Sequence, residues 1–394
     1  MSAESPQIKS KAAKKFVVVA WSGAVPIHLS PRGQRTQHLM NALRSYGDVE
    51  RVGGDNIPQW LAGSSERTTS SWYRQLLHRL VYNLLIDKYE ISVWRELRRW
   101  RPSADAAVLV AHPCSHLSIA ARKLTRDGIP YIVDIGDPWI LTSPSPEVGR
   151  LSRWRARRQE RKVWSLAVGA IVTTQAQGDA LSKLFPHLRI LVRPNGYSSS
   201  DDVERSQQTS TASARDPNKL HLVHYGSLYG ERVDFEKVFR QLAKSGRWQS
   251  ITLHQYGSDW GDALASILAY SKVDRRAPIT WTEVLSGARM FDAAIVIGWR
   301  NPRQMPSKTV QYLTLPIPRI AISTSDGGDA LAAYVADRPG WALIDDVSEQ
   351  AAQIVADHVA KQWSDTELQA PKDESWAGVE RLLGAFVNET TSGI

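Results

Sequence analysis

Hydrophobic and polar residues alternate along the first half of the chain in a pattern that predicts strands separated by helices. Short apolar runs, such as residues 16–21 and 106–111, predict buried strands, whereas apolar residues three or four positions apart predict helices. This alternation is typical of α/β proteins with a parallel sheet. The predicted strands span residues 15–20, 106–111, 130–135, 170–174 and 190–193, and the predicted helices span residues 36–46, 71–100, 117–127 and 149–167.

A second series of strands and helices follows a polar stretch. Residues 198–218 are rich in Ser, Thr, Gln and Asp and lack hydrophobic periodicity, so they predict a linker. Beyond it, the same reasoning predicts a second α/β unit. Its strands are expected at residues 220–225, 251–256, 279–281, 293–297, 319–322 and 341–344, and its helices at 234–244, 261–270, 283–289, 308–315, 348–363 and 375–386.

Length and composition fit two domains of ordinary size. The chain has 394 residues, of which 42% are hydrophobic and 23% charged, which excludes fibrous and disordered classes. We expect Rossmann-like domains at residues 1–197 and 219–347, joined by the linker at 198–218. Residues 348–394 are expected to form C-terminal helices that pack back toward the first domain.

Charge is distributed unevenly between the two halves. Residues 1–200 hold 29 Lys and Arg against 15 Asp and Glu, a net charge of +14, whereas residues 201–394 carry −5. Such asymmetry favours different partners for the two domains. The first domain is expected to face an anionic partner such as a phosphorylated lipid, an acidic glycan, a membrane surface or nucleic acid.

The cysteine content and the apolar runs indicate a cytoplasmic protein. The chain has one cysteine, Cys114, and no Cys/His cluster with the spacing of a zinc site, so neither an internal disulfide nor a structural metal is expected. The polar residues 1–15 and the short apolar run after them do not predict a secretion signal. No apolar run approaches the roughly 20 residues that a membrane span needs.

Two loops of the second domain have the chemistry of anion binding. Gly226 and Arg232 lie between a predicted strand and a predicted helix, where glycine allows close backbone approach and arginine can pair with a phosphate. Ser307 and Lys308 open another helix, which Ser307 can cap while Lys308 reaches the same strand ends. A tight turn and an ordinary capped helix with a solvated lysine are the structural alternatives.

The order of these motifs resembles the GT-B glycosyltransferases, and in particular the large retaining family that includes sucrose synthase-like and bacterial polysaccharide enzymes. The resemblance covers residues 15–345 and predicts two Rossmann-like domains whose parallel sheets face a central cleft. The residues that carry it are Gly33, Gln34, Arg35, the segment 134–139, Arg193, Pro194, Asn195, Gly196, Gly226, Arg232, Gly257, Pro306, Ser307, Lys308, Tyr312 and Pro318.

The resemblance implies a site for a nucleotide-sugar donor in the second domain. Arg232 and Lys308 would neutralise the departing nucleoside diphosphate. Trp281 would stack on the base, although an aromatic residue at a strand end is often part of the core. The remaining donor-binding residues would be Gly226, Gly257, Ser307 and Gln311, and the acceptor-binding residues Gly33 and Arg35. The resemblance implies neither a metal nor another cofactor.

The sequence departs from the family pattern at several positions. Family members often carry two glutamates eight positions apart, where this chain has Arg303 and Gln311; an amide still hydrogen-bonds a hydroxyl but lacks charge. Asp137 stands near the family's usual histidine and would contact the transferred sugar or act as a base, unless it only caps the next segment. His112 and His116 follow a strand, and either can act as an acid or as an ordinary hydrogen-bonded histidine.

The predicted helix at residues 149–167 is strongly basic. Its Arg residues and Lys162 bracket Trp154 and Trp164, a combination typical of helices that lie on an anionic bilayer. A solvated basic face over an ordinary core stripe is the alternative. The chain shows no motif of a known nucleic-acid reader, so nucleic acid is not an expected partner.

The sequence as a whole favours a retaining glycosyltransferase, cytoplasmic or peripheral on the inner face of the membrane. It would move a hexosyl group from a nucleotide-diphosphate sugar to a glycan, lipid-linked or natural-product acceptor. Two alternatives remain open: a non-catalytic GT-B-like partner in a glycan-assembly complex, and a nucleotide-sugar 2-epimerase.

Overall fold

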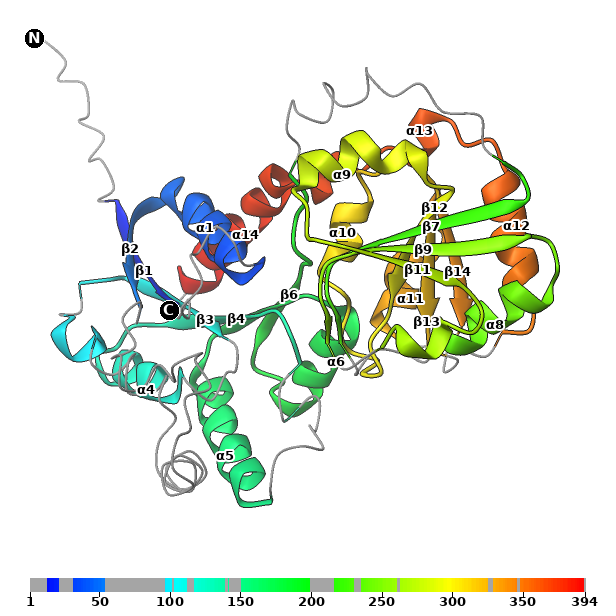
Figure 1. The fold of residues 1–394 in the computed structure, drawn as a ribbon. Helices are drawn as coiled ribbons and strands as arrows, with labels where there is room; N and C mark the ends of the chain where they lie inside the picture. Colours follow the sequence, from blue (N-terminus) through cyan, green and yellow to red (C-terminus); the bar gives the residue numbers. More distant parts are fainter. Residues whose placement is uncertain are drawn as a thin grey trace, which may run out of the picture. The chain divides into compact units, whose positions relative to one another are not determined.

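The chain folds into two α/β units (Figure 1). The first comprises residues 1–171, 185–191 and 380–394, and the second comprises residues 172–184 and 192–379. This division therefore assigns the last 15 residues of the chain to the first unit, and residues 172–184 to the second. The computed structural model describes residues 13–20, 31–53, 96–100, 103–111, 117–138, 141, 150–198, 216–229, 235–260, 263–324, 329–345 and 348–392.

A six-stranded sheet forms the centre of the first unit. Its strand order is β2-β1-β3-β4-β5-β6, so the chain reverses its direction of winding between β1 and β3. The central strands are buried on both faces, which is why they appear in the sequence as continuous apolar runs. The strands are β1 (Lys14–Ala20), β2 (Gly47–Val52), β3 (Ala106–Ala111), β4 (Tyr131–Ile135), β5 (Gly169–Val172) and β6 (Arg189–Val192).

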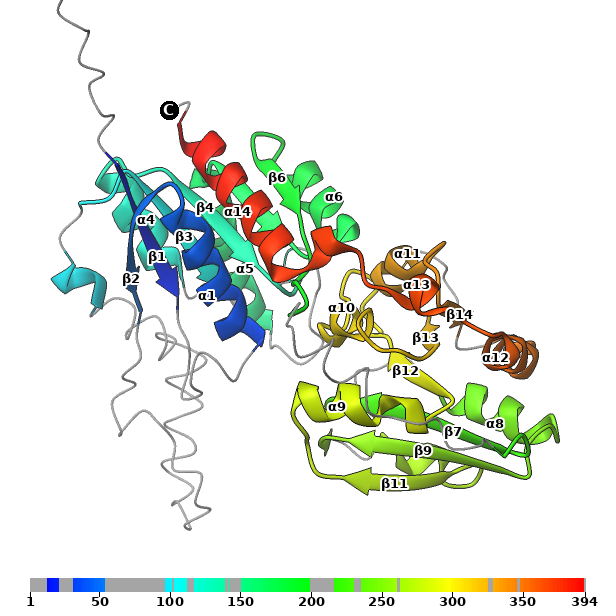
Figure 2. The same cartoon turned by 90° about the horizontal axis from the view of Figure 1, so that it is seen from above.

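Helices cover both faces of this sheet. Figures 1 and 2 show α1 (Pro31–Arg44) and α14 (Trp376–Thr391) on one face, and α4 (Ser118–Arg126) and α5 (Arg150–Leu166) on the other. Helix α14 packs closely on α1: a Cβ atom at Gly384 would lie 2.8 Å from the carbonyl oxygen of Ala42. Helix α6 (Gln175–Leu184) follows β5 along the chain.

The second unit also has a six-stranded sheet, with the order β11-β9-β7-β12-β13-β14. All its pairings are parallel, and the direction of winding reverses between β7 and β12. In open parallel sheets, ligands bind beyond the carboxyl ends of the strands at such a switch point. The strands are β7 (Lys219–Tyr225), β9 (Ser250–Tyr256), β11 (Lys272–Arg276), β12 (Ala293–Ile297), β13 (Arg319–Ser323) and β14 (Trp341–Asp345), and β8 (Leu228–Tyr229) pairs with β10 (Asp259–Trp260) outside the sheet.

Strand β12 contributes side chains to a hydrophobic cluster on each face of this sheet. Ala293, Ile295 and Ile297 belong to one hydrophobic cluster, and Ala294 and Val296 to the cluster on the opposite face, as the two-residue period of a strand requires. Helices α8 (Glu236–Lys244) and α12 (Ala351–Ala360) contribute to the first cluster, and α9 (Trp281–Gly287), α10 (Lys308–Tyr312) and α11 (Ala330–Val335) to the second. The shorter elements are α13 (Asp365–Leu368), η3 (Ala265–Ile267), η4 (Ala288–Met290) and η5 (Lys372–Glu374).

Two elements predicted for the second unit are wrong. Residues 279–281 form no strand, because Thr280 caps α9: its hydroxyl accepts the Glu283 N–H at 3.3 Å, and the Glu283 carboxylate accepts the Thr280 N–H at 2.7 Å. Residues 263–270 form only turns and the short helix η3, where a longer helix was expected. Strands β2 and β11 and helix α6 were not predicted. Most of the predicted helix at residues 71–100 lies outside the described residues.

Candidate functional site

Two glycines make close contact at the switch point of the second sheet. Gly226 follows β7 with φ +126°, and Gly257 follows β9 with φ +131°, a backbone region that residues with a side chain rarely adopt. A Cβ atom at Gly257 would lie 2.5 Å from the Gly226 carbonyl oxygen. The two strand-end loops therefore touch through their backbones, and only glycine fits at position 257.

A buried polar pair fixes the orientation of the Gly226 peptide. The Gln255 side-chain amide donates to the Gly226 carbonyl oxygen at 2.6 Å, and its own oxygen lies 2.8 Å from His224 Nδ1. Gly226 N–H in turn donates to the Tyr256 carbonyl oxygen at 2.8 Å. Buried side chains therefore hold this loop in one conformation before any ligand arrives.

Lys308 on α10 lies directly over this loop. A Cβ atom at Gly226 would be 3.5 Å from Lys308 Cγ, so the stem of the lysine occupies the space that glycine leaves free. Lys308 Nζ lies 5.7 Å from the ring centroid of Trp281 and makes neither a hydrogen bond nor an ion pair within the described part of the chain. Burial lowers the pKa of Lys308 below that of an ordinary lysine. Within the described residues, the site thus holds a partly desolvated cation with no counter-ion.

An aromatic cluster positions α10 on the end of β7. The Tyr312 hydroxyl accepts the Tyr225 N–H at 2.6 Å, and the Tyr312 ring stacks against Trp281 at a centroid distance of 6.2 Å. Trp281 also donates its indole N–H to the Thr314 hydroxyl at 3.2 Å. Trp281 therefore packs against the core on one ring face and supports the lysine, and its predicted stacking on a base remains a prediction.

Two buried polar atoms on α10 lack hydrogen-bond partners. Gln311 Oε1 and Thr309 Oγ1 are both inaccessible to solvent and unpaired in the described structure. Gln311 comes three residues after Lys308, so the two side chains leave the same side of the helix. Buried acceptors are normally satisfied, which makes Gln311 a candidate for contact with a ligand hydroxyl.

Ser307 does not cap α10 as the sequence led us to expect. Its side chain is exposed and makes no capping hydrogen bond, because its own backbone is already helical. Arg232, the predicted partner of Lys308, lies outside the described residues. The predicted donor set therefore comes together in the structure at Gly226, Gly257, Trp281, Lys308 and Gln311.

In the first unit, Arg35 is bound to a carboxylate. Its guanidinium donates to Asp134 at 2.8–2.9 Å through Nε and Nη2, and both residues are buried. Asp134 lies in β4, three residues before the partly buried Asp137. Arg35 thus holds the end of the strand from which Asp137 follows. Gly33 lies two residues earlier on α1, and His112, His116 and Cys114 lie outside the described residues.

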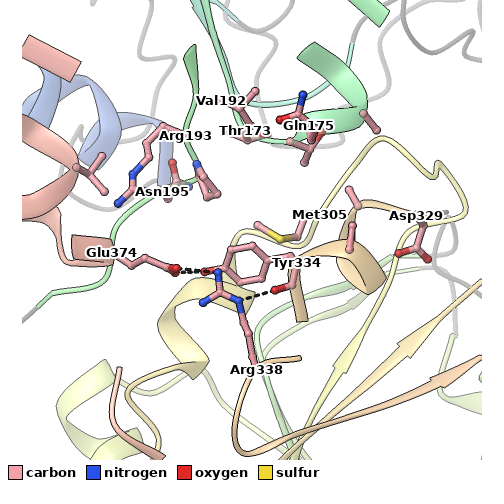
Figure 3. A pocket seen from close by; sticks show the side chains of 16 residues that line it. Thr173, Gln175, Val192, Arg193, Asn195, Met305, Asp329, Tyr334, Arg338 and Glu374 are labelled. Carbon is pink, nitrogen blue, oxygen red and sulfur yellow. Dashed lines mark hydrogen bonds and ion pairs between the residues drawn. The ribbon is translucent and has the colours of Figure 1, made fainter. Parts of the chain in front are cut away.

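A cavity of about 250 Å³ lies in the second unit (Figure 3). Arg193, Pro194 and Asn195 from the predicted motif line it, together with Met305, which precedes the Pro306-Ser307-Lys308 turn. Most of the other lining residues belong to no motif that the sequence predicts. The other lining residues are Thr173, Thr174, Gln175, Ala176, Val192, Asp329, Ala330, Ala333, Tyr334, Arg338, Glu374 and Val379.

The wall of this cavity contains a partly exposed ion pair. Arg338 Nη2 lies 2.7 Å from Glu374 Oε1, and Arg338 Nε donates to the Tyr334 carbonyl oxygen at 2.5 Å. The Tyr334 hydroxyl also contacts Glu374 (Figure 3), and burial raises the pKa of Tyr334 above its ordinary value. Arg193 also lines the cavity, and its Nη2 donates to the Asp373 carbonyl oxygen.

The described residues contain no group of three or more His, Cys, Asp or Glu side chains arranged to hold a metal ion. Within the same residues, none of the helices combines the length and the apolar character that crossing a bilayer requires.

Similarity to solved structures reveals the class of fold. The N-terminal domain of Candida albicans trehalose-6-phosphate phosphatase matches with a TM-score of 0.64 and 12% identity, over 98% of each chain. Sucrose-phosphate synthase from Thermosynechococcus elongatus matches at 0.58 and 11%, over 97% of this chain and 100% of that one. Anabaena HepE in complex with UDP-glucose matches at 0.52 and 12%, also over 97% and 100%.

These likenesses extend over nearly the whole chain at low identity and therefore identify its fold. The protein has an α/β fold of the GT-B type, with two Rossmann-like units, as the sequence predicted. No protein-family model matches the chain, and no curated protein matches its sequence.

Proposed function

We propose that this protein is a glycosyltransferase that moves a sugar from a nucleotide-diphosphate sugar to an acceptor hydroxyl. The observation that carries the proposal is Lys308: a largely buried cation with no anionic partner in the described structure, held over Gly226 at the switch point of a parallel sheet. A diphosphate is the ligand whose charge and compactness suit this position.

The glycine loops give such a ligand access to the backbone. Gly226 and Gly257 have no side chains, and the rigid Gly226 peptide allows the phosphates to approach the main chain closely. An anion beside Lys308 offsets the desolvation of the ammonium, so binding raises the lysine pKa again. Arg232, three residues beyond β8 in the sequence, is proposed as the second cation by resemblance. Ser307 is proposed to lie near the same phosphates.

Gln311 is proposed to contact a hydroxyl of the donor. Its unpaired, buried Oε1 accepts an O–H, which replaces the missing hydrogen bond on α10. An amide at this position holds the hydroxyl by a neutral hydrogen bond, which is weaker than the charge-assisted bond of a glutamate. Donor affinity therefore rests more heavily on the diphosphate contacts than in family members that carry glutamate there.

The reaction requires stabilisation of the departing diphosphate. The bond between the anomeric carbon and the diphosphate oxygen breaks, its electron pair remains on that oxygen, and Lys308 neutralises the developing charge. The acceptor hydroxyl oxygen forms the new bond to the anomeric carbon. In the retaining mechanism that we propose, its proton passes to the departing phosphate on the same face of the sugar. Asp137 and His112 are proposed to orient the acceptor hydroxyl and the sugar.

The acceptor is proposed to be a glycan, a lipid-linked sugar or a natural product bound by the first unit. Gly33 is retained as a predicted acceptor contact. Arg35 is proposed to position the end of β4, because its buried guanidinium is hydrogen-bonded to Asp134 and the residue is only 3% exposed.

Calorimetric titration with nucleoside diphosphates and nucleotide sugars tests the donor site. Binding of one nucleotide class is expected, and Lys308→Met should weaken it by roughly 10- to 100-fold, the worth of a charge-assisted contact. Lys237→Met removes an exposed lysine from α8 and serves as the matched control. If no nucleotide binds, or if both variants bind alike, the proposed donor site is wrong.

Product analysis separates the proposed reaction from two others. A transferase produces a glycosylated acceptor and nucleoside diphosphate. A 2-epimerase needs no acceptor, and a non-catalytic partner binds nucleotide sugar without turnover. Either of the last two outcomes would overturn glycosyl transfer while leaving the donor site in place.

A further inference from the structure

The outer face of α5 presents an uninterrupted row of cations. Arg157, Arg158, Arg161 and Lys162 are exposed, and their spacing of three and four residues places them on one side of the helix. None of the four side chains makes a salt bridge or a hydrogen bond in the described part of the chain, although the charge of Arg157 acts on the buried Glu160 and lowers its pKa. Within the described residues, the row is therefore a strongly positive surface whose side chains form no ion pairs.

The only acidic residue of α5 points the other way. Glu160 is 1% exposed, and its carboxylate accepts the Leu141 N–H at 2.9 Å and the Trp164 indole N–H at 3.3 Å. Val163 and Trp164 on the same inner side are fully buried. The inner side therefore packs the helix against the unit, and the four exposed cations of the outer side lie away from this packing.

Large apolar side chains flank the cations. Trp154 is 58% exposed at one end of the row and Leu166 is 43% exposed at the other. The Arg158 guanidinium lies 5.7 Å from the ring centroid of Trp154, so the cation and the indole share one surface. Exposure of such a large apolar area to water is unfavourable. A helix face that only contacts water would carry polar residues at these positions.

We infer that the outer face of α5 docks this protein on an anionic lipid bilayer. Tryptophan is favoured at the boundary between headgroups and hydrocarbon, and arginine and lysine bind anionic headgroups from the same face. Double-stranded nucleic acid would account for the cations through its phosphates, but its stacked bases leave no partner for the exposed indole and leucine beside them. This inference is independent of the proposed sugar transfer.

Co-sedimentation with phospholipid vesicles tests the inference. The full chain should bind vesicles that contain phosphatidylglycerol and phosphatidylcholine, should bind pure phosphatidylcholine at least about tenfold more weakly, and should be released as salt rises. Arg157→Glu with Arg161→Glu should reduce binding by roughly tenfold or more, since two attractive charges become repulsive. Trp154→Ala should reduce it by roughly threefold to tenfold through lost apolar contact.

A charge-matched control separates the face from net charge. Lys237→Glu with Lys244→Glu reverses two exposed cations on α8 of the second unit and should leave vesicle binding unchanged. Circular dichroism should show that all variants remain folded, because every altered residue is exposed. Equal losses in both double variants would overturn the inference. So would competition by double-stranded DNA at matched phosphate concentration combined with no effect of Trp154→Ala, which would identify the face as a polyanion site.

Discussion

Lys308 Nζ lies 5.7 Å from the ring centroid of Trp281, and this cation–π contact is the only electrostatic contact of the ammonium group within the described residues. A cation over an indole is stabilised less than one beside a carboxylate, so part of the cost of burying the ammonium remains uncompensated. Without an anion, the ammonium group of Lys308 is thus incompletely compensated, and binding of an anion would offset the remaining cost of its burial. Activity and stability place opposite demands on this residue.

Lys308→Met should make the ligand-free protein more stable. The methionine keeps much of the apolar stem and removes the desolvated charge, so the apparent free energy of unfolding should rise by about 1 kcal/mol. Chemical denaturation without nucleotide measures this change. A variant less stable than the parent would show that the ammonium has a favourable partner in the folded protein.

Gly257→Ala should destabilise the second unit strongly. A methyl group would lie 2.5 Å from the Gly226 carbonyl oxygen and would also have to adopt φ +131°, so a loss of about 2–4 kcal/mol is expected. Gly246→Ala is the matched control: it has φ +65° with nothing within 4 Å of the added atom, and should cost only about 1–2 kcal/mol. Equal losses of unfolding free energy in the two variants would mean that the close contact between the Gly226 and Gly257 loops adds nothing to the cost of the substitution.

The free energy of unfolding should depend on pH through Glu160. Burial raises the pKa of this carboxyl from 4.5 to about 7, so the folded state binds its proton more tightly than the unfolded state. The resulting stabilisation is complete below pH 4.5 and is lost as pH rises through about 7. The total loss should be about 3 kcal/mol.

Glu160→Gln should flatten this pH dependence, because the amide does not titrate. Glu349→Gln makes the same chemical change at an exposed position and should leave the parental profile intact. Urea denaturation between pH 5 and pH 8 distinguishes the two variants. Parallel profiles for the parent and Glu160→Gln would exclude Glu160 as the group responsible.

Asp134→Asn should destabilise the first unit by about 3–5 kcal/mol, because it leaves the buried Arg35 guanidinium without its carboxylate. Replacing both residues, as in Arg35→Met with Asp134→Leu, should recover most of this loss. A double-mutant cycle measured by denaturation gives the coupling energy. Additive losses would contradict the pairing that the 2.8 Å contact indicates.

The sequence predicted the buried parts of the sheets far better than their edges. Strand β12 is apolar at every position and was found, because parallel strands between two helix layers must be apolar on both faces. Strands β2 and β11 were missed, since Gly47–Val52 and Lys272–Arg276 are largely polar edge strands. Ile279 and Trp281 predict a strand at residues 279–281, but the Thr280–Glu283 capping box begins a helix there.

The candidate site was predictable where it follows strand ends. Gly226, Gly257 and Lys308 come together because the carboxyl ends of β7, β9 and β12 share one edge of the sheet, which spacing along the chain can anticipate. Arg338 and Glu374 were not predictable, because their pairing depends on how distant segments pack and no motif marks either residue. The missing cap at Ser307 likewise reflects local backbone geometry that residue type does not specify.

Helix α14 has a consequence for synthesis on the ribosome. Residues 380–394 complete the first unit, where Lys14 Nζ in β1 lies 3.0 Å from Asn388 Oδ1, 374 residues further along the chain. All residues of the second unit, by contrast, precede residue 380. A nascent chain can therefore finish the second unit while the first still lacks its last helix. The first unit is therefore the first whose synthesis begins and the last to be completed. During translation it needs protection for longer than the second unit does.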